Sequence, residues 1–226
     1  MEVGRKVNVA IDGPSGAGKS TVSIEIAKRL NYFYINTGSF YRAIAYYFLR
    51  NNISLKDIEN NLDELLSKIN ITFDKNENIF VNGENYINFL RTDEVSLFSS
   101  NIAKFQKIRD FVVKNIQKTT NVQKGFIMDG RDTTFKIMPN AEVKIFLSAS
   151  PTERARRRVE QNKQLGYKTN FTEVLKEIKE RDNNDINRKI DPLHKTDDAI
   201  EIDCTLIPFE QVVEKIISII QEKEAL

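Results

Sequence analysis

The chain contains very few of the residues that support disulfide, thiol or imidazole chemistry. Among its 226 residues there is one cysteine, Cys204, so no disulfide can form within the chain, which fits a reducing compartment. The chain has one histidine, His194, which argues against a histidine-rich metal site. A catalytic triad based on histidine could use only this residue. The N-terminus lacks the apolar run of a signal peptide, and no stretch approaches the roughly 18 apolar residues that span a membrane. We therefore expect a cytoplasmic protein without a membrane partner.

A large excess of charge of one sign is also lacking. The formal net charge is +2, which is too small to indicate nucleic acid or an acidic membrane as the main partner. Hydrophobic residues make up 40% and charged residues 29% of the chain, as in ordinary soluble globular proteins. The length allows one large domain, or one domain that carries an insert. No surplus amphipathic helix is evident, which favours a monomer.

Short apolar runs alternate with helix-like segments along the chain. We expect strands at residues 7–11, 32–35, 125–128, 143–147 and 199–203, and helices at residues 19–30, 39–52, 93–119, 151–164, 171–189 and 209–224. This alternation predicts the α/β class, with a parallel sheet and helices on both faces. Between residues 53 and 90 the pattern changes to a weak helix and a small hairpin at Asn82-Gly83, which we interpret as an insert.

A glycine-rich segment, GPSGAGKS, matches the phosphate-binding pattern G-x-x-x-x-G-K-[ST] between a predicted strand and a predicted helix. Its glycines let backbone N–H groups turn toward an anion, and the following helix adds the positive end of its dipole. Lys19 is expected to reach the β- and γ-phosphates, and the Ser20 hydroxyl to bind Mg²⁺. The predicted nucleotide-binding residues are Gly13, Pro14, Ser15, Gly16, Ala17, Gly18, Lys19, Ser20 and Thr21.

Two other classes of phosphate-loop protein fit the sequence less well. The stretch NKQL has Leu165 where the guanine-reading pattern N-K-x-D requires aspartate. The stretch FIMDGRD, residues 126–132, only partly resembles the apolar strand with adjacent carboxylates of motor ATPases. Arginine is abundant instead, and its guanidinium binds phosphate through two donors. Such abundance suggests more phosphate than one triphosphate supplies.

In the predicted helix at 171–189, an apolar stripe becomes charged without changing direction. The stripe contains Phe171, Val174, Leu175 and Ile178, and it continues as Arg181, Asp185 and Arg188. Buried charge is costly unless it is paired. We therefore interpret this face as the wall of a polar cleft, and the alternative is a structural cluster of ion pairs.

A second charged helix is predicted to begin at Pro151, with Ser150 as its N-cap and Glu153 at the third position. Three arginines share one face of this helix: Arg154, Arg157 and Arg158. A polar loop, QLGYKTN, joins it to the helix at 171–189. We predict a lid that excludes water and brings arginines onto a transferring phosphoryl group, and the alternative is a solvated helical hairpin.

The motifs occur in a characteristic order along the chain. They are IDGPSGAGKS, NTGSFYRA, LRTDEV, DGRD, VKIFLSASPTERARRR, EIKERDNND followed by NR, and PFEQVVEKI. Together they resemble the bacterial cytidylate kinase family, whose members phosphorylate CMP and dCMP with ATP. The resemblance implies a phosphate-loop core of residues 1–36, 91–150 and 191–226. It also implies a nucleoside monophosphate-binding domain over about 37–90, with the insert at 53–90, and a small helical lid at 151–190.

The resemblance also implies roles for particular residues. The phosphate of CMP would be held by Arg42, Arg131 and Arg188. The cytosine would be contacted by Thr37, Asp132 and Arg109, and the sugar by Ser100, Arg181 and Asp185. The catalytic set would be Lys19, Arg131, Arg154, Arg157 and Arg158, with Mg²⁺ bound at Ser20.

Several positions depart from the family's common pattern or stay open. This chain has Asn36 where the family often has aspartate, and TTFKIMP where a stretch containing glycine usually follows DGRD. Asp129 is either a carboxylate on the Mg²⁺ side or a structural one, and Gly130 is expected to let the backbone turn. Because nine residues of an unbroken helix would put Ser100 and Arg109 on opposite faces, we predict a bend near residues 103–106.

A phosphate acceptor explains why arginine is abundant and no histidine lies near a motif. A phosphate monoester is already an anion near neutral pH, because its second pKa is about 6, so no general base is needed. Asp132 accepts hydrogen bonds only, which favours the amino group of cytosine over the carbonyl oxygen of uracil. The alternatives are a phosphate-loop kinase of another small acceptor, either UMP or a small alcohol, and a non-catalytic ATP-binding module.

Overall fold

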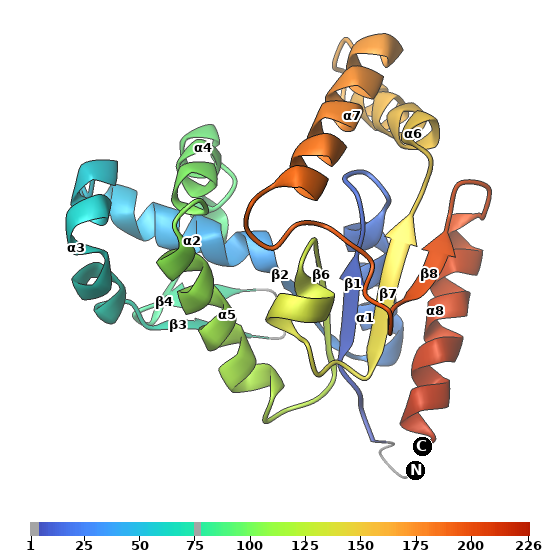
Figure 1. Cartoon of the computed structure of the whole chain (residues 1–226), viewed down its shortest axis with the longest axis horizontal. Helices are drawn as coiled ribbons and strands as arrows, with labels where there is room; N and C mark the ends of the chain where they lie inside the picture. The colour runs from blue at the N-terminus through green and yellow to red at the C-terminus, as the bar shows by residue number, and fades with distance from the viewer. Residues whose placement is uncertain (1–4, 75–77) are drawn as a thin grey trace. The chain divides into compact units, whose positions relative to one another are not determined.

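The computed structural model describes residues 5–74 and 78–226, and the chain divides into two compact units (Figure 1). The first unit combines the N-terminal part, up to Tyr32, with Lys124–Leu226. The second unit is Phe33–Gln123. No helix in the described ranges is both long and apolar enough to cross a bilayer.

The first unit is built on parallel strands joined by helices. Its elements are β1 (Val9–Asp12), α1 (Lys19–Leu30), β6 (Phe126–Gly130), the π-helical turn η2 (Thr133–Ile137), β7 (Val143–Ser148), α6 (Pro151–Gln164), α7 (Phe171–Asn187), β8 (Ile200–Asp203) and α8 (Phe209–Glu224). The central sheet has the order β2-β6-β1-β7-β8, where β2 is Phe33–Asn36, and β1 pairs in parallel with both β6 and β7. The predicted α/β class with a parallel phosphate-loop sheet is confirmed.

Strand register decides which side chains meet at the carboxyl edge of this sheet. All four residues of β1 are buried, as expected for a central parallel strand. Asp12, the last residue of β1, lies level with Gly130 at the end of β6. The segments that follow β1 and β6 therefore leave the sheet at the same edge, where open α/β sheets bind ligands.

The helices of the first unit begin and end where local signals place them. The bounds of α1, α6 and α8 agree with the predicted 19–30, 151–164 and 209–224. The Ser150 hydroxyl accepts a hydrogen bond from the backbone of Glu153 at 3.2 Å, and Pro151 occupies the first turn. The N-cap and proline predicted for α6 are confirmed.

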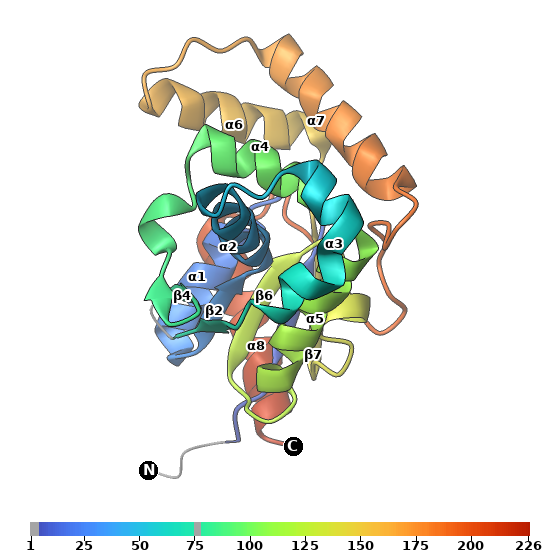
Figure 2. The same ribbon diagram turned by 90° about the vertical axis from the view of Figure 1, so that its left-hand side faces the viewer.

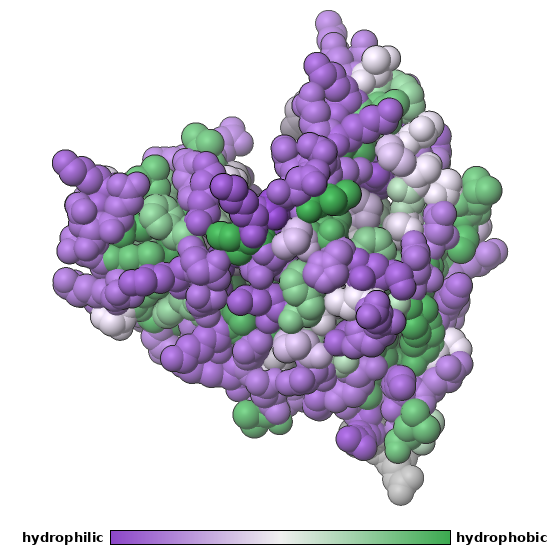
Figure 3. All heavy atoms as spheres, viewed as in Figure 1, coloured by the Kyte–Doolittle hydropathy of each residue, from purple (hydrophilic) through white to green (hydrophobic). Residues whose placement is uncertain are grey.

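Helices α6 and α7 form a hairpin with a small apolar core (Figure 2). Ala155 of α6 packs with Val174 and Ile178 of α7. The predicted core-facing stripe of this helix is wrong at Phe171, which is 40% exposed. It is also wrong at Arg181, which is exposed. The visible surface of α7 is largely hydrophilic (Figure 3).

The continuation of the apolar stripe on α7 runs through Asp182 rather than Arg181. Positions three and four residues beyond Ile178 lie on either side of the same stripe, so spacing alone could not choose between them. The choice is made by a partner on α6, because Asp182 forms an ion pair with Arg154 at 2.6 Å.

The second unit combines helices with a small antiparallel sheet. Its elements are β2 (Phe33–Asn36), α2 (Thr37–Arg50), α3 (Leu55–Ser67), β3 (Ile71–Phe73), β4 (Ile79–Val81), β5 (Glu84–Asn85), the 3-10 turn η1 (Ile87–Phe89), α4 (Asp93–Ile102) and α5 (Gln106–Thr120). Strands β4 and β5 pair antiparallel around Asn82 and Gly83, whose φ angles are 52° and 85°. Two left-handed residues are what a tight hairpin turn requires, so the predicted hairpin is confirmed.

The bend predicted near residues 103–106 is present. Helix α4 ends at Ile102 and α5 begins at Gln106. Between them Phe105 is extended, with φ −81° and ψ 117°, so the break forms without a proline. The prediction of a single continuous helix over 93–119 from local sequence is therefore corrected to two helices.

The close approach of the phosphate loop to β7 depends on the missing side chain of Gly13. A Cβ atom on Gly13 would lie 2.0 Å from the backbone oxygen of Leu147, and its φ is +151°. Gly18 is also left-handed, with φ +93°, but a Cβ atom there would meet nothing within 4 Å. An alanine at Gly13 would therefore meet a steric collision, whereas an alanine at Gly18 would meet backbone strain alone.

We expect Gly13→Ala to destabilise the protein by about 3 kcal/mol or more, because the loop must move off β7. Gly18→Ala should cost only about 1–2 kcal/mol, the strain of a left-handed alanine. Urea unfolding of both variants, followed by circular dichroism, measures the difference. Equal losses of stability in the two variants would show that the contact with Leu147 is unimportant.

Candidate active site

The phosphate loop connects β1 to α1, the context that its pattern requires. Lys19, the first residue of α1, is 5% exposed. Its Nζ atom donates hydrogen bonds to the carbonyl oxygens of Gly13 at 2.7 Å and Pro14 at 2.8 Å. The ammonium group is therefore held inside the curl of the loop, where it can bind a phosphate.

A cavity of about 540 Å³ opens beside this loop. Its lining combines loop residues with side chains from β6, from the segment after β6 and from α6: Ser15, Gly16, Gly18, Lys19, Ser20, Thr21, Asp129, Arg131, Arg154, Arg157, Arg158 and Gln161. All five residues of the predicted catalytic set line this one cavity. So many cationic side chains suit a polyanion such as a triphosphate.

The electrostatic environment makes Lys19 unusually easy to deprotonate. Burial, followed by repulsion from Arg131, lowers the pKa of Lys19 to about 7, although Asp129, Asp12 and Asp185 oppose this shift. A phosphate group placed beside the ammonium would favour its charged form and raise the pKa again. Anion binding and proton uptake at Lys19 are therefore linked.

Ser20 and Asp129 meet across the base of the cavity. The Ser20 hydroxyl donates a hydrogen bond to Oδ2 of Asp129 at 2.7 Å. A hydroxyl beside a carboxylate is a pair of hard oxygen ligands of the kind that Mg²⁺ accepts. Within the described ranges, no group of three His, Cys, Asp or Glu residues could hold a metal without help.

Asp12, which the sequence reasoning missed, holds the segment after β6 in place. Its buried carboxylate accepts hydrogen bonds from the backbone of Thr133 at 2.9 Å and of Thr134 at 2.8 Å, and from the Thr134 hydroxyl at 2.7 Å. This explains the π-helical turn in the TTF stretch. An aspartate ending an apolar strand was the available signal, as it was for Asp129.

Gly130 was expected to let the backbone turn, and it does so by leaving space rather than by a left-handed backbone. Its φ lies outside the left-handed region, so no turn there requires glycine. A Cβ atom at this position would instead meet the hydroxyl oxygen of Thr133 at 2.4 Å. Gly130 provides room for the turn that Asp12 organises.

Four predicted substrate-binding residues meet where β6 ends and α7 finishes. Arg131 donates from Nε to Asp185 at 2.6 Å. Arg188 lies 3.4 Å from Asp132 and donates to the carbonyl oxygen of Asp191. Each arginine of this group thus has a carboxylate beside it, and both pairs are only partly exposed.

The three arginines of α6 that were predicted to share a face have different environments. Arg154 is 3% exposed and is bound to Asp182. Arg157 is partly buried and donates to Glu153 at 2.9 Å and to the carbonyl oxygen of Cys204 at 2.7 Å. Arg158 is exposed and donates to Gln161 at 3.2 Å.

A second cavity of about 580 Å³ shares Gly18, Thr21 and Arg157 with the first. Part of its lining is apolar and comes from α1, from the segment between β8 and α8, and from the start of α8: Val22, Leu206, Ile207, Pro208, Phe209 and Val212. A mainly apolar wall beside a phosphate-binding cavity suits the flat ring of a nucleobase.

The other predicted substrate residues belong to the second unit. Thr37 begins α2, and Arg42 lies one turn further along. A Cβ atom on Gly38 would lie 3.2 Å from Nη1 of Arg42, so the guanidinium folds back over the start of the helix. Burial and the neighbouring Arg91 lower the pKa of Arg42. A cation at a helix N-terminus is a suitable anion site.

The predicted pair Ser100 and Arg109 is separated by the break between α4 and α5. Ser100 is exposed and donates to the carbonyl oxygen of Ser96 at 3.1 Å. Arg109 is 9% exposed. The two residues therefore no longer have to lie on opposite faces of one helix.

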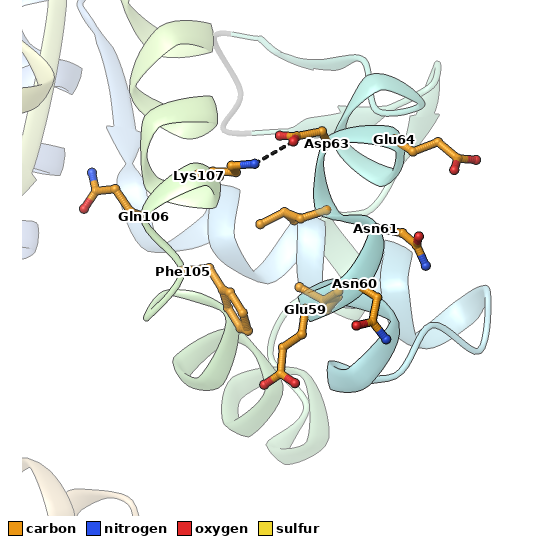
Figure 4. A pocket seen from close by; sticks show the side chains of 10 residues that line it. Glu59, Asn60, Asn61, Asp63, Glu64, Phe105, Gln106 and Lys107 are labelled. Atoms are coloured by element: carbon orange, nitrogen blue, oxygen red, sulfur yellow. Dashed lines mark hydrogen bonds and ion pairs between the residues drawn. The ribbon is translucent and has the colours of Figure 1, made fainter.

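A third cavity, of about 490 Å³, lies within the second unit between α3 and the start of α5 (Figure 4). Lys107 crosses its edge to form an ion pair with Asp63 at 2.5 Å, and Phe105 points into it (Figure 4). None of the predicted site residues lines this cavity. Its carboxylates and its single lysine do not suit a polyphosphate.

Comparison with known proteins agrees with the geometry of the phosphate-loop cavity. The family model described as cytidylate kinase matches residues 9–222. The chain is 55% identical over 219 residues to the cytidylate kinase of Mycoplasmopsis synoviae, covering 96% of this chain and 99% of that protein. It is 43% identical over 222 residues to the cytidylate kinase of Bacillus subtilis, covering 97% and 98%.

A solved structure shares the fold at low sequence identity. An uncharacterized protein from Eubacterium ventriosum superposes with a TM-score of 0.53 at 15% identity, covering 96% of this chain and 99% of that one. The family is shown by the sequence matches, which extend over almost the whole chain. The protein belongs to the cytidylate kinase family.

Proposed function

We propose that this protein transfers the γ-phosphoryl group of ATP to the phosphate of CMP and dCMP, giving CDP and dCDP. One observation carries the proposal. In a chain of the cytidylate kinase family, the cavity beside the phosphate loop is walled by Lys19 and by arginines from two further segments. No histidine lines this cavity, which suits an acceptor that needs no general base.

The donor nucleotide occupies the two adjoining cavities on this proposal. The triphosphate lies against the loop and Lys19, and the adenine ring enters the partly apolar cavity beyond Gly18. The guanidinium of Arg157 lies at the junction, where Glu153 and the Cys204 carbonyl fix its edge. The two cavities share Gly18, Thr21 and Arg157, so one nucleotide can extend across both.

Magnesium would be held by Ser20, with Asp129 beside it. The hydroxyl of Ser20 is released for a cation when its hydrogen bond to Asp129 is given up. A bound Mg²⁺ would neutralise charge on the phosphates. The protein's own contribution is to keep these two oxygens next to Lys19.

The acceptor phosphate replaces a carboxylate as the partner of Arg131. Asp185 now holds that guanidinium at 2.6 Å, so an incoming phosphate exchanges one anion for another rather than filling an unpaired site. Asp185 is then free to accept hydrogen bonds from the sugar, to which Arg181 can donate. In the first unit, Arg188 is the second proposed contact of the phosphate and Asp132 the proposed contact of the base. In the second unit, the residues proposed to contact CMP are Thr37, Arg42, Ser100 and Arg109.

The chemistry that follows is alignment and neutralisation of charge. The acceptor phosphate is an anion near neutral pH, since its second pKa is about 6. Lys19 and the arginines hold donor and acceptor in line and stabilise the charge of the transferring group. In this scheme the α6–α7 hairpin acts as the lid, residues 37–90 form the acceptor domain, and one chain suffices.

A panel of acceptors tests the proposed function. ATP consumption is measured with CMP, dCMP, UMP and shikimate as acceptors, in the presence and absence of Mg²⁺. We expect turnover that depends on CMP or dCMP and on Mg²⁺. Turnover with a small alcohol alone would indicate the rival kinase, and ATP binding without turnover would indicate a regulatory module.

We expect Asp132→Ala to lower kcat/KM for CMP by about 10- to 100-fold, the usual cost of losing one discriminating hydrogen bond. The value of kcat/KM for UMP should fall much less, so the ratio of kcat/KM for CMP to that for UMP decreases. Asp198→Ala is the control, because it removes a carboxylate whose side chain is 59% exposed and pairs with Lys144. Equal kcat/KM for CMP and UMP in the unaltered protein would contradict the assigned role of Asp132.

We expect ADP affinity to fall about 20-fold between pH 7.5 and 9, because Lys19 has a pKa of about 7 in the free protein. The sign follows from linkage: the free protein loses the Lys19 proton in this range, whereas bound phosphate retains it. Affinity is therefore greatest below pH 7 and decreases as pH rises. Calorimetry at several pH values measures both the affinity and the proton uptake.

Lys19→Arg is the control for this pH dependence. An arginine stays charged throughout the range, so its weaker binding should no longer depend on pH. A pH slope that survives in Lys19→Arg would assign the titration to another group.

A further inference from the structure

The inner face of α7 is joined to the core of the first unit by two ion pairs on successive turns. Asp182 pairs with Arg154 of α6, and Asp185 pairs with Arg131 after β6, each at 2.6 Å. Asp185 and Arg131 belong to the proposed acceptor site. Asp182 has no role in the scheme above, although its side chain is only 15% exposed.

Arg154 uses almost all of its donors on protein groups. Its Nε atom donates to the carbonyl oxygen of Ala149 at 2.8 Å. Its Nη1 atom donates to the carbonyl oxygen of Ser15 at 2.8 Å and to Asp182 at 2.9 Å, and its Nη2 atom donates to Asp182 at 2.6 Å. A guanidinium has five N–H groups, so one remains for a ligand. Arg154 is thus fixed in place rather than able to swing onto a phosphate.

The position of Ser15 makes this arrangement a link between two ligand sites. Ser15 lies in the phosphate loop, and a Cβ atom on the next residue, Gly16, would lie 3.5 Å from Cβ of Arg154. Arg154 therefore rests against the loop backbone on one side and is held by Asp182 on the other. One turn along α7 from Asp182 stands Asp185, which holds Arg131.

We propose that Asp182 is a positioning residue that makes donor and acceptor binding cooperative. The proposal rests on the proposed function, because it takes the loop cavity as the donor site and Arg131 with Asp185 as part of the acceptor site. Donor phosphates order the loop and hence the Ser15 carbonyl. Through Arg154 and Asp182, the same ordering fixes α7 and places Asp185 and Arg188 for the acceptor.

The coupling must be reciprocal, because it is a difference between binding free energies. A donor that orders the link leaves less conformational freedom for the acceptor to remove. Arg154 must also keep a partner, since a buried guanidinium without one is unstable. Removing Asp182 therefore takes the carboxylate partner away from Arg154, the most buried residue that connects the loop to α7.

Calorimetry of CMP binding with and without a saturating non-hydrolysable ATP analogue and Mg²⁺ measures the coupling. In the unaltered protein the analogue should tighten CMP binding about fivefold or more, within the range typical of coupled sites. In Asp182→Asn the ratio should fall to less than about twofold, while the affinity for CMP alone changes little. Circular dichroism and thermal unfolding check that the variant is folded at the temperature used.

Glu180→Gln is the matched control on the same helix. Glu180 loses the same charge, but its side chain is 63% exposed and lies 3.9 Å from Lys176. It should keep the full coupling ratio. A ratio that stays unchanged in Asp182→Asn, or that falls equally in Glu180→Gln, overturns the proposal.

The double variant Arg154→Met with Asp182→Leu covers the case in which Asp182→Asn fails to fold. It removes both charges, so no buried ion is left without a partner. This variant should fold and lack coupling, and retention of full coupling in it would overturn the proposal. If the unaltered protein does not bind CMP at all, both the proposed function and the role of Asp182 are wrong. CMP binding with intact coupling in the variants rejects only the role of Asp182.

Discussion

Charge buried at the carboxyl edge of a parallel sheet must be paired, and this requirement organises the site. Asp12, Lys19, Asp129, Asp132 and Arg154 are all less than 9% exposed. Isolated, any of them would be strongly unfavourable in such surroundings. Backbone donors satisfy Asp12, loop carbonyls hold Lys19, and Asp182 holds Arg154. The positions of the loop, of the turn after β6 and of α7 follow from these contacts.

The buried charged groups and their partners are of two kinds. Some contacts belong to the scaffold, and others are exposed enough for a ligand to replace one partner. Asp12 with the two threonine amides is fully enclosed and contacts backbone, so it belongs to the scaffold. The pair of Arg131 with Asp185 is nearly one-fifth exposed on each side, and its arginine lines the loop cavity. On the proposed function, a ligand phosphate replaces the carboxylate there, so one anion is exchanged for another. A kinase of this family can therefore remain folded without substrate although its site is crowded with cations.

Lys19 shows how such a site prepares for its ligand. Its ammonium group is buried close to Arg131, and the nearby carboxylates only partly compensate. The result is a lysine whose charge is unstable until an anion arrives. An entering phosphate pairs with the ammonium group and favours its charged form.

Much of the fold was predictable because its signals are local. The helix start at Pro151, the turn at Asn82-Gly83 and the apolar runs of the central strands each depend on a few neighbouring residues. The break before Gln106 was predicted only because two residues assigned to one site would otherwise lie on opposite faces of a helix. Local sequence alone favoured a continuous helix there.

By itself the sequence determined the phosphate loop, the α/β alternation and the set of arginines available to the site. The tertiary structure decided which carboxylate each arginine meets. Arg154 and Asp182 are 28 residues apart, and Arg131 and Asp185 are 54 apart. Such pairs depend on how α6, α7 and β6 pack, and helical spacing could not distinguish Arg181 from Asp182. Asp12 was missed for the same reason, because its partners 121 and 122 residues away are brought to it only by strand register and the turn after β6.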